Sequence, residues 1–561
     1  MGLFTRKSKP SRPDTRGNGG LDTSSLDSDG SNLKSPATFL TSFASNTSGG
    51  VGVGSRNSGG TGFPQSPLTP MTPPLPKVNL PKPPDPSLDA AGYLRSLGSV
   101  RERSKIVTEK ALKNHLNHFD VDLERFPDVV SFVCRIIKRD YDAPFHTIPG
   151  HGRAQHFAVG GRDRIAHLLS TFADVDDTEK CRRLIDLFLV SVLLDAGAGM
   201  SWSFKSADNG RIYRRSEGLA IASFEMFKTG IFSGNPSNKY QVDKDGLRKL
   251  TVEMVAKGLQ SKPGNEVAGL EGRTQLLLRL GEALDQKREF FGHDGRPGNM
   301  IDYLLAHPTT QASSCPIVIL PVLWNVLMSG LAPIWPQSRT AIDGISLGDA
   351  WPCSSMPQVQ QFNHTSPRSS GRSSVNSPKT FSPFPNTTPT SSTPATAAWE
   401  SILPFHKLTQ WLTYSLMQPM QSLLKIQFAG TELLTGLPEY RNGGLFVDLG
   451  VLTLKPADQE RGLQNYSDWC RRTGTTSHEV APMFEPSDDV IVEWRGVTVG
   501  FLDKLCADVN VKLREDLKGG ELTLAQLLEA GSWKGGREIA EVSRPNTKEP
   551  PILIDSDGTV F

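Results

Sequence analysis

Apolar residues recur at three- and four-residue spacings through most of the chain beyond residue 90, a pattern typical of helices with one buried face. It predicts helices over Phe126–Ile137, Arg164–Phe172, Arg214–Phe227 and Gln275–Phe291. The run Cys181–Leu194 is apolar on nearly all sides, so we expect this helix to lie in the centre of the fold. The pattern therefore predicts a mostly α protein, a single large helical domain with few short strands.

Capping residues predict where two helices begin. Ser99 is followed three residues later by Glu102, and Thr523 by Gln526, which is the spacing of a capping box. We expect helices to start at Ser99 and Thr523, and the second of them to end at Gly531.

Two stretches lack the helical pattern. Residues 1–85 are rich in Gly, Ser, Thr and Pro, and residues 354–398 in Ser, Thr and Pro without an acidic residue. Such compositions bury too little apolar area to offset chain entropy, so both are predicted to be disordered. The helical catalytic domain then has two parts, 86–353 and 399–561. Ser-Pro and Thr-Pro pairs make the disordered segments candidate substrates of proline-directed kinases.

Composition narrows the classes of function. The 61 Lys and Arg residues nearly balance the 59 Asp and Glu residues, so no nucleic-acid partner is expected. The six cysteines form no Cys-x-x-Cys pair, which argues against a zinc ribbon, a dithiol redox centre and a disulfide framework. The chain shows neither a signal peptide nor an apolar run long enough to span a membrane. We therefore expect a cytoplasmic protein with no membrane partner.

Candidate chemistry centres on the stretch Leu437–Asp448. Glu439, Tyr440 and Arg441 lie between a proline and the pair Gly443-Gly444, and glycines let the backbone approach a ligand closely. Polar groups on a short loop between apolar elements are a common place for function. The alternative is a surface turn with an ordinary Glu-Arg pair.

A second candidate group follows the buried helix. Asp195 comes at its end, before Gly197, Gly199 and Trp202. A carboxylate there can accept two hydroxyl groups while the tryptophan supplies a flat wall of a pocket. The alternative is a helix end closed by Gly197, with Asp195 bonded to backbone amides. An acid at the negative end of a helix is unfavourable unless it is paired, which counts against this alternative.

A polar stripe on a predicted helix supplies further candidates. His406, Gln410 and Tyr414 recur every four residues and so share one face, and Trp411 adds an aromatic wall. Three hydrogen-bonding side chains suit a helix that lines a pocket. The alternative is an ordinary solvated face.

A glycine-rich loop carries three basic candidates, His151, Arg153 and His156. The histidine spacing does not match a His-x-x-x-His zinc pair, and no Gly-Lys-Ser/Thr follows as in a Walker loop. Free amides and fixed positive charge suit a phosphate or a sugar better than a metal. We therefore expect no metal and no other cofactor.

Together these groups suit a phosphorylated ribosyl compound. Cleavage of a ribosyl C1–nitrogen bond builds positive charge on the ring, which a carboxylate stabilises while a second acid holds the ring hydroxyls. The predicted catalytic residues are Glu439 and Asp195, and the predicted substrate-binding residues are His151, Arg153, His156, Trp202, His406, Gln410, Trp411, Tyr414, Tyr440 and Arg441.

Several motifs give the chain a family resemblance over residues 90–353 and 399–561. They include Ile148-Pro-x-His-x-Arg153, Leu194-Asp-Ala-Gly-Ala-Gly199, Gly269-Leu-Glu-Gly-Arg273, Pro404-Phe-His-Lys407, Leu437-Pro-Glu-Tyr-Arg-Asn-Gly-Gly444, Glu493-Trp-Arg495 and Ser556-Asp-Gly-Thr-Val-Phe561. In these motifs the chain resembles the uracil-catabolism protein family, the fourth protein of the fungal pathway and its bacterial relatives. The resemblance implies a pathway that handles uracil as its ribose phosphate, opens the ring and ends in urea.

A fainter similarity concerns the same carboxylates. Asp195 through Trp202, Ser216 to Gly230 and Pro438–Arg441 are similar to segments of the queuosine-nucleotide salvage glycosidases, which are helical proteins with a DNA-glycosylase-like fold. In that family an Asp-Tyr-Arg segment carries the catalytic carboxylate. The similarity implies that Glu439 takes this place, one methylene longer.

The hypothesis that follows is a hydrolase that cuts the N-ribosyl bond of a ring-opened uracil ribose phosphate. Glu439 would stabilise or attack the ring cation, Asp195 would orient the sugar, and His151 with Arg153 would hold the phosphate. One alternative is a metal-dependent amidohydrolase of the ureido group. Another is a non-catalytic scaffold or sensor of the pathway.

Overall fold

The computed structural model describes residues 78–199, 202–336, 339–358, 399–474 and 480–555, all within the compact unit Val51–Phe561. The two stretches predicted to be disordered, their Ser-Pro and Thr-Pro pairs and the end of the chain from Ser556 fall almost wholly outside these residues.

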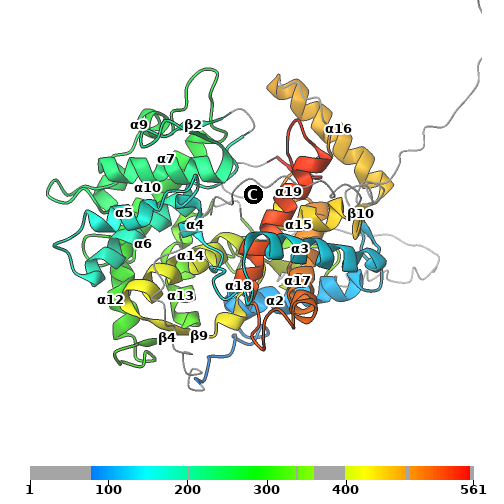
Figure 1. Ribbon diagram of the computed structural model, residues 1–561, viewed down its shortest axis with the longest axis horizontal. Helices are drawn as coiled ribbons and strands as arrows, with labels where there is room; N and C mark the ends of the chain where they lie inside the picture. Colours follow the sequence, from blue (N-terminus) through cyan, green and yellow to red (C-terminus); the bar gives the residue numbers. More distant parts are fainter. Residues whose placement is uncertain (1–77, 200–201, 337–338, 359–398, 475–479, 556–561) are drawn as a thin grey trace, which may run out of the picture. The chain divides into compact units, whose positions relative to one another are not determined.

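Helices dominate the described chain, as predicted, and Figure 1 shows their arrangement. In the first part of the chain they are α1 (Ala90–Leu94), α2 (Leu97–Ala111), α3 (Phe126–Asp140), α4 (Arg153–Phe157), α5 (Arg164–Ser170), α6 (Asp177–Leu193), α7 (Arg215–Thr229), α8 (Lys244–Arg248), α9 (Val252–Gly258), α10 (Leu270–Gln286), α11 (Arg288–Phe291), α12 (Met300–Ala306) and α13 (Leu320–Gly330). In the second part they are α14 (Lys407–Leu424), α15 (Tyr440–Asp448), α16 (Pro456–Thr473), α17 (Asp489–Lys512), α18 (Leu524–Leu527) and α19 (Trp533–Ser543).

Strands are short, and the described strands pair two by two. The antiparallel pairs are β1 (Phe119–Val121) with β10 (Leu452–Leu454), β2 (Phe204–Lys205) with β3 (Ile212–Tyr213), β5 (Ala341–Ile342) with β6 (Ile345–Ser346), and β7 (Ala350–Pro352) with β8 (Ile402–Pro404). The parallel pairs are β4 (Ile317–Ile319) with β9 (Gln427–Ala429), and β11 (Met483–Phe484) with β12 (Leu553–Ile554). In three pairs one strand precedes residues 359–398 and its partner follows them. Trp351 lies opposite Leu403 in one of these pairs.

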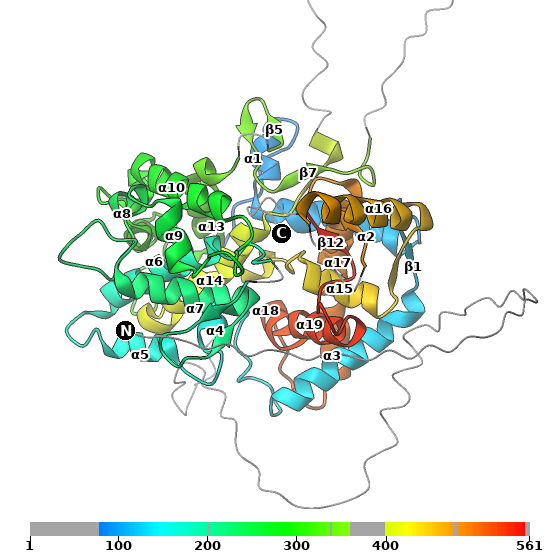
Figure 2. The ribbon, with the colours of Figure 1, turned by 90° about the horizontal axis from the view of Figure 1, so that it is seen from above.

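The helix α6 lies in the core, as its apolar sequence predicts. Every residue from Leu184 to Leu193 is buried, and α6 packs against α14, α7 and α4. Two of these neighbouring helices, α7 and α14, contribute residues to the cavity described below. A second core helix, α17, packs against α2 and α3, while α15 packs against α19, which Figure 2 shows side by side.

The predicted helix starts are only partly correct. Thr523 forms the expected capping box with Gln526 at the start of α18. The prediction for Ser99 is wrong, because Ser96 caps α2 and the Ser99 hydroxyl donates to backbone oxygens of Leu94 and Ser96. Gly531 does not end a helix either. The chain continues there through a π turn, η8 (Leu528–Ser532), directly into α19.

The glycine pair Gly443-Gly444 lies inside α15 and not in a loop. A Cβ atom on Gly443 would lie 2.8 Å from the Trp494 ring of α17, and one on Gly444 would lie 2.9 Å from Pro551. The glycines thus allow close packing of α15 against its neighbours, and this corrects the expectation that they let the backbone approach a ligand.

None of the described helices is long and apolar enough to cross a membrane.

Candidate functional site

A cavity of about 330 Å³ lies where the first turns of α7, α14 and α15 meet. Its walls also include residues 197–199, two residues of α16, Trp533 and part of the segment from Glu549 to Asp555. Of the residues predicted from the sequence, those that line the cavity are His151, His156, Asp195, Trp411, Glu439, Tyr440 and Arg441. These residues are separated by up to 290 positions in the sequence, so the fold gathers most of the predicted site into one space.

Glu439 caps the N-terminus of α15 and faces the cavity. Its carboxylate accepts hydrogen bonds from the backbone N–H groups of Arg441, at 2.8 Å, and Asn442, at 2.5 Å. Burial raises the pKa of Glu439, while these two amides and the charge of Lys407 oppose the rise. The two amide hydrogen bonds fix the orientation of this carboxylate, and the helix end favours its negative charge.

Asp195 lines the cavity and forms an ion pair with Arg153 on its core side. Its Oδ2 accepts a 2.7 Å hydrogen bond from the fully buried guanidinium of Arg153. Burial raises the pKa of Asp195, and Arg153 and Lys407 oppose the rise. The Ser216 hydroxyl also lowers the pKa, yet Oδ1 has no partner within hydrogen-bond geometry among the described residues. A buried acceptor without a partner in a cavity wall suits a ligand hydroxyl.

Arg153 does not line the cavity. Its Nε donates to the Ser191 hydroxyl at 2.7 Å and its Nη2 to the Ser191 backbone oxygen at 3.0 Å, besides the pair with Asp195. The guanidinium is held in the core by these contacts, so it positions Asp195. This geometry does not fit the predicted role of Arg153 in holding a phosphate.

His156 is held as a neutral ring. Its Nδ1 faces Nη1 of Arg153 at 3.1 Å and must accept, because a guanidinium only donates. Burial lowers the pKa of His156 well below its usual value, and Arg153 lowers it further. The ring proton therefore lies on Nε2. His156 can offer one N–H donor to a ligand in the cavity.

His151 and Glu529 form a carboxylate–histidine pair at the cavity wall. Nδ1 of His151 lies 2.7 Å from Glu529 Oε2, which fixes the Nδ1 proton toward the carboxylate. In the neutral ring, Nε2 is then free to accept a proton. The π turn η8 carries Glu529, and π turns often occur at functional sites.

Lys407, which is not among the predicted site residues, places a cation in the same cavity. Burial lowers its pKa to about 8, while the nearby charges of Glu439 and Asp195 oppose the drop. Its ammonium lies 5.2 Å from the centroid of the Trp411 ring. Two carboxylates and one lysine of lowered pKa thus surround one space, an arrangement common in acid–base sites.

A buried ion pair fixes the start of α14, where Lys407 lies. Both guanidinium nitrogens Nη1 and Nη2 of Arg495 bond to Asp349, at 2.8 and 2.7 Å. The Asp349 carboxylate also accepts the backbone N–H of Lys407 at 3.0 Å. Asp349 and the motif residue Arg495 therefore hold the backbone that presents Lys407.

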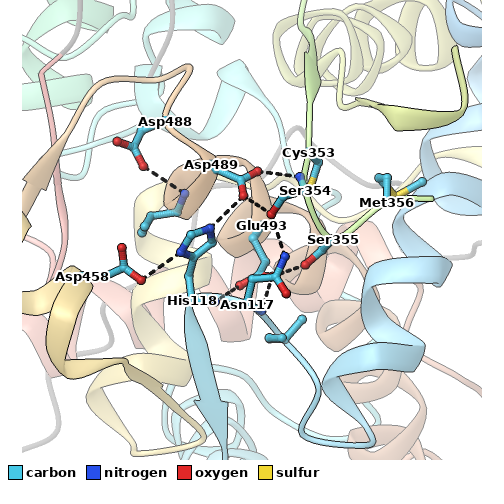
Figure 3. Close-up of polar contacts among 12 residues, drawn as sticks. Asn117, His118, Cys353, Ser354, Ser355, Met356, Asp458, Asp488, Asp489 and Glu493 are labelled. Atoms are coloured by element: carbon cyan, nitrogen blue, oxygen red, sulfur yellow. Dashed lines mark hydrogen bonds and ion pairs between the residues drawn. The ribbon is translucent and has the colours of Figure 1, made fainter. Parts of the chain in front are cut away.

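Aromatic side chains form much of the remaining wall: Trp411, Tyr440, Tyr466, Trp469 and Trp533. Two of them, Tyr466 and Trp469, come from α16, which is anchored at its first turn. Figure 3 shows His118 between Asp458 of α16 and Asp489 of α17, at 2.9 and 2.8 Å. Burial lowers the pKa of His118, but the hydrogen bonds to both carboxylates outweigh it and raise the pKa to about 9.

A family profile described as "Protein of unknown function (DUF1688)" matches residues 93–561. The chain belongs to the DUF1688 family. "Uracil catabolism protein 4" of Lachancea kluyveri is 42% identical over 475 residues, which cover 84% of this chain and 98% of the relative. "Protein urg3" of Schizosaccharomyces pombe is 42% identical over 477 residues, which cover 85% of this chain and 100% of the relative. The resemblance to the uracil-catabolism family is confirmed.

Four predicted site residues of this DUF1688 protein lie outside the cavity lining in addition to Arg153. Trp202 is buried and donates to the Leu259 backbone oxygen at 2.9 Å. The stripe on α14 is neither solvated nor open to the cavity, because its members bond within the core. His406 bonds to the Leu94 backbone oxygen, Gln410 to the Thr435 hydroxyl and Tyr414 to the Thr435 backbone oxygen.

Five residues at the site of this DUF1688 protein are not among those predicted from its sequence: Lys407, Arg215, Ser216, Glu529 and Trp533. Lys407 lies in the motif Pro404-Phe-His-Lys407, in which the adjacent His406 is the predicted site residue. One sequence signal for Lys407 is its position as the first residue of a helix, because side chains at a helix N-terminus lie near the loop that precedes the helix. The pairing of Glu529 with His151 joins residues 378 positions apart and has no local signal.

Proposed function

We propose that this protein is a hydrolase of uracil catabolism that cleaves the N-ribosyl bond of a ring-opened uracil ribose phosphate, a ribosylurea-type compound. The name of its relative, "Uracil catabolism protein 4", supports the pathway. The observation that carries the reaction is the meeting of Glu439, Asp195 and Lys407 in one aromatic-walled cavity. Proximity of two carboxylates is the usual requirement for cleavage at a sugar C1 atom.

In the proposed reaction the C1–nitrogen bond breaks, and its electron pair leaves with the urea nitrogen. Lys407 donates the proton that this nitrogen needs, since a pKa of about 8 suits an acid at neutral pH. Glu439 stabilises the positive charge that develops on the ring. Asp195 accepts hydrogen bonds from ring hydroxyls through its unpartnered oxygen.

A water molecule completes the proposed reaction by adding to C1. Nε2 of His151 takes a proton from this water, and Glu529 stabilises the imidazolium that forms. The products are urea, or a ureido acid from a longer substrate, and ribose phosphate. Atoms balance with one water consumed for each bond cleaved.

The test is incubation of the purified protein with ribosylurea 5-phosphate, followed by assay of urea and ribose 5-phosphate. We expect both products in equal amounts. Ammonia in place of urea, with zinc found by elemental analysis, would instead indicate a metal-dependent amidohydrolase. Tight binding without any product would indicate a sensor or scaffold, and either result would overturn the proposal.

A further inference from the structure

Two arginines from different helices meet at one end of the cavity. Arg215 is the first residue of α7 and Arg441 is the second of α15, and both line the cavity. Nη1 of Arg215 donates to the Lys548 backbone oxygen at 3.0 Å, and Nη1 of Arg441 donates to the same oxygen at 2.9 Å. The Lys548 carbonyl thus contacts two guanidinium groups 226 positions apart in the sequence, and Nη2 of Arg215 also donates to the Thr547 backbone oxygen at 2.6 Å.

The positive charge of this pair is only partly balanced. Arg215 pairs with Glu549 at 3.3 Å, and burial together with the charge of Arg441 lowers its pKa. Arg441 is 5% exposed, and among the described residues the Lys548 oxygen is the one hydrogen-bond acceptor of its side chain. Glu439 is near enough for its charge to interact with that of Arg441, but among the described residues no hydrogen bond joins the two side chains. Arg441 therefore retains donors for a ligand.

The backbone around Arg215 also favours an anion. Arg215 has a φ of 54°, in the left-handed region that side chains other than glycine seldom adopt. Such a conformation persists where the surrounding structure fixes it, and it is frequent at ligand sites. The preceding residue, Arg214, makes no side-chain cap to α7, so the positive end of this helix of 15 residues lies beside the two guanidinium groups.

We infer that Arg215 and Arg441 form the subsite that holds the phosphate monoester of the substrate. Guanidinium groups bind phosphate oxygens through paired N–H donors, which a lysine cannot do. This assignment rests on the proposed function for the identity of the sugar. It replaces Arg153, which is bound in the core, as the phosphate ligand. The alternative is that both arginines only fasten the segment 547–549 to the domain.

The test is calorimetric binding of ribose 5-phosphate and of ribose to the full chain and to the single variants Arg215→Gln and Arg441→Gln. The control is Arg537→Gln, since Arg537 is a neighbouring arginine that pairs with Glu217 and does not line the cavity. We expect the wild type to bind ribose 5-phosphate at least about 30-fold more tightly than ribose. Each cavity variant should lose most of this preference with its ribose affinity unchanged, and the control should keep it.

Equal loss of affinity for both sugars, or no loss, would overturn the inference and leave the arginines a structural role. If Arg441→Gln does not fold, Arg215→Gln alone decides, because its side chain is 31% exposed and its removal disturbs less packing. The outcome is separate from the proposed reaction. Arginine-dependent binding of ribose 5-phosphate without urea release would support the subsite and overturn the hydrolase. Urea release by the wild type, with variants that bind ribose 5-phosphate as the wild type does, would support the hydrolase and overturn the subsite.

Discussion

Arg153 donates a 2.7 Å hydrogen bond to Asp195 from the core side of the cavity wall. The guanidinium is fully buried, and the second oxygen of Asp195 has no partner among the described residues. The pair thus turns one carboxylate oxygen toward the core and leaves the other for a ligand. The negative charge of Asp195 is therefore compensated by a residue that does not line the cavity.

Arg153→Met is expected to destabilise the protein strongly, because Asp195 would remain buried without its counterion. Loss of one partner of a buried ion pair costs roughly 3–5 kcal/mol. Urea unfolding measures this cost, and Arg153→Met with Asp195→Asn should recover part of it. The matched control, Arg162→Met, breaks an exposed pair with Asp208 and should cost about 1 kcal/mol or less. Similar values for both single variants would refute the argument.

Lys407 makes activity and stability respond to pH in opposite directions. Its pKa is lowered from 10.5 to about 8 in the fold, so the acid form needed by the leaving group is lost as pH rises through 8. Turnover should fall there. The unfolded chain still binds the proton between these two values, so the contribution of Lys407 to stability increases over the same range. Lys407→Arg should lower turnover strongly, because a guanidinium does not give up its proton, and the residual rate should no longer fall above pH 8. An unchanged rate and pH profile would exclude Lys407 as the acid.

Glu529→Gln should lower turnover by about 10- to 100-fold, because the imidazolium of His151 would lose its compensating charge. Steady-state kinetics at saturating substrate measures the effect. Glu538→Gln is the control, since Glu538 pairs with Arg139 on the surface of α19 and should leave turnover unchanged. A normal rate for Glu529→Gln would show that the His151–Glu529 pair does not activate water.

His118 is expected to stabilise the anchored end of α16 in a pH-dependent manner. Its pKa rises from 6.5 to about 9 on folding, so its contribution is complete below about pH 6.5 and is lost as pH rises through 9. His118→Gln should reduce the free energy of unfolding by roughly 2 kcal/mol at pH 6 and by much less at pH 10. His115→Gln, an exposed neighbour, is the control. A pH-independent difference would contradict this role.

The sequence predicts those features that depend on local pattern. The helical fold, the buried helix α6 and the cap at Thr523 all follow from apolar spacing and short-range hydrogen bonds. The prediction that Ser99 caps a helix is wrong, because Ser96, three residues earlier, has the same hydroxyl group and accepts the backbone N–H of Ser99. Local pattern alone does not decide between two such serines.

The candidate site is predicted less completely, because partners distant in sequence decide the role of each side chain. Glu439 and Asp195 reach the cavity as expected. His406 and Gln410 do not, since the Leu94 carbonyl and Thr435 satisfy them within the core. A polar stripe on a helix can therefore face solvent, line a pocket or, as here, form hydrogen bonds within the core.

The most direct test of the account is the single-turnover rate of Glu439→Gln with ribosylurea 5-phosphate. Glutamine keeps one oxygen to cap α15, so unfolding should change by only about 1 kcal/mol. The rate should fall about 100-fold or more, while Glu432→Gln, an exposed acid nearby, stays at the wild-type rate. An undiminished rate for Glu439→Gln would contradict the assignment of the catalytic carboxylate.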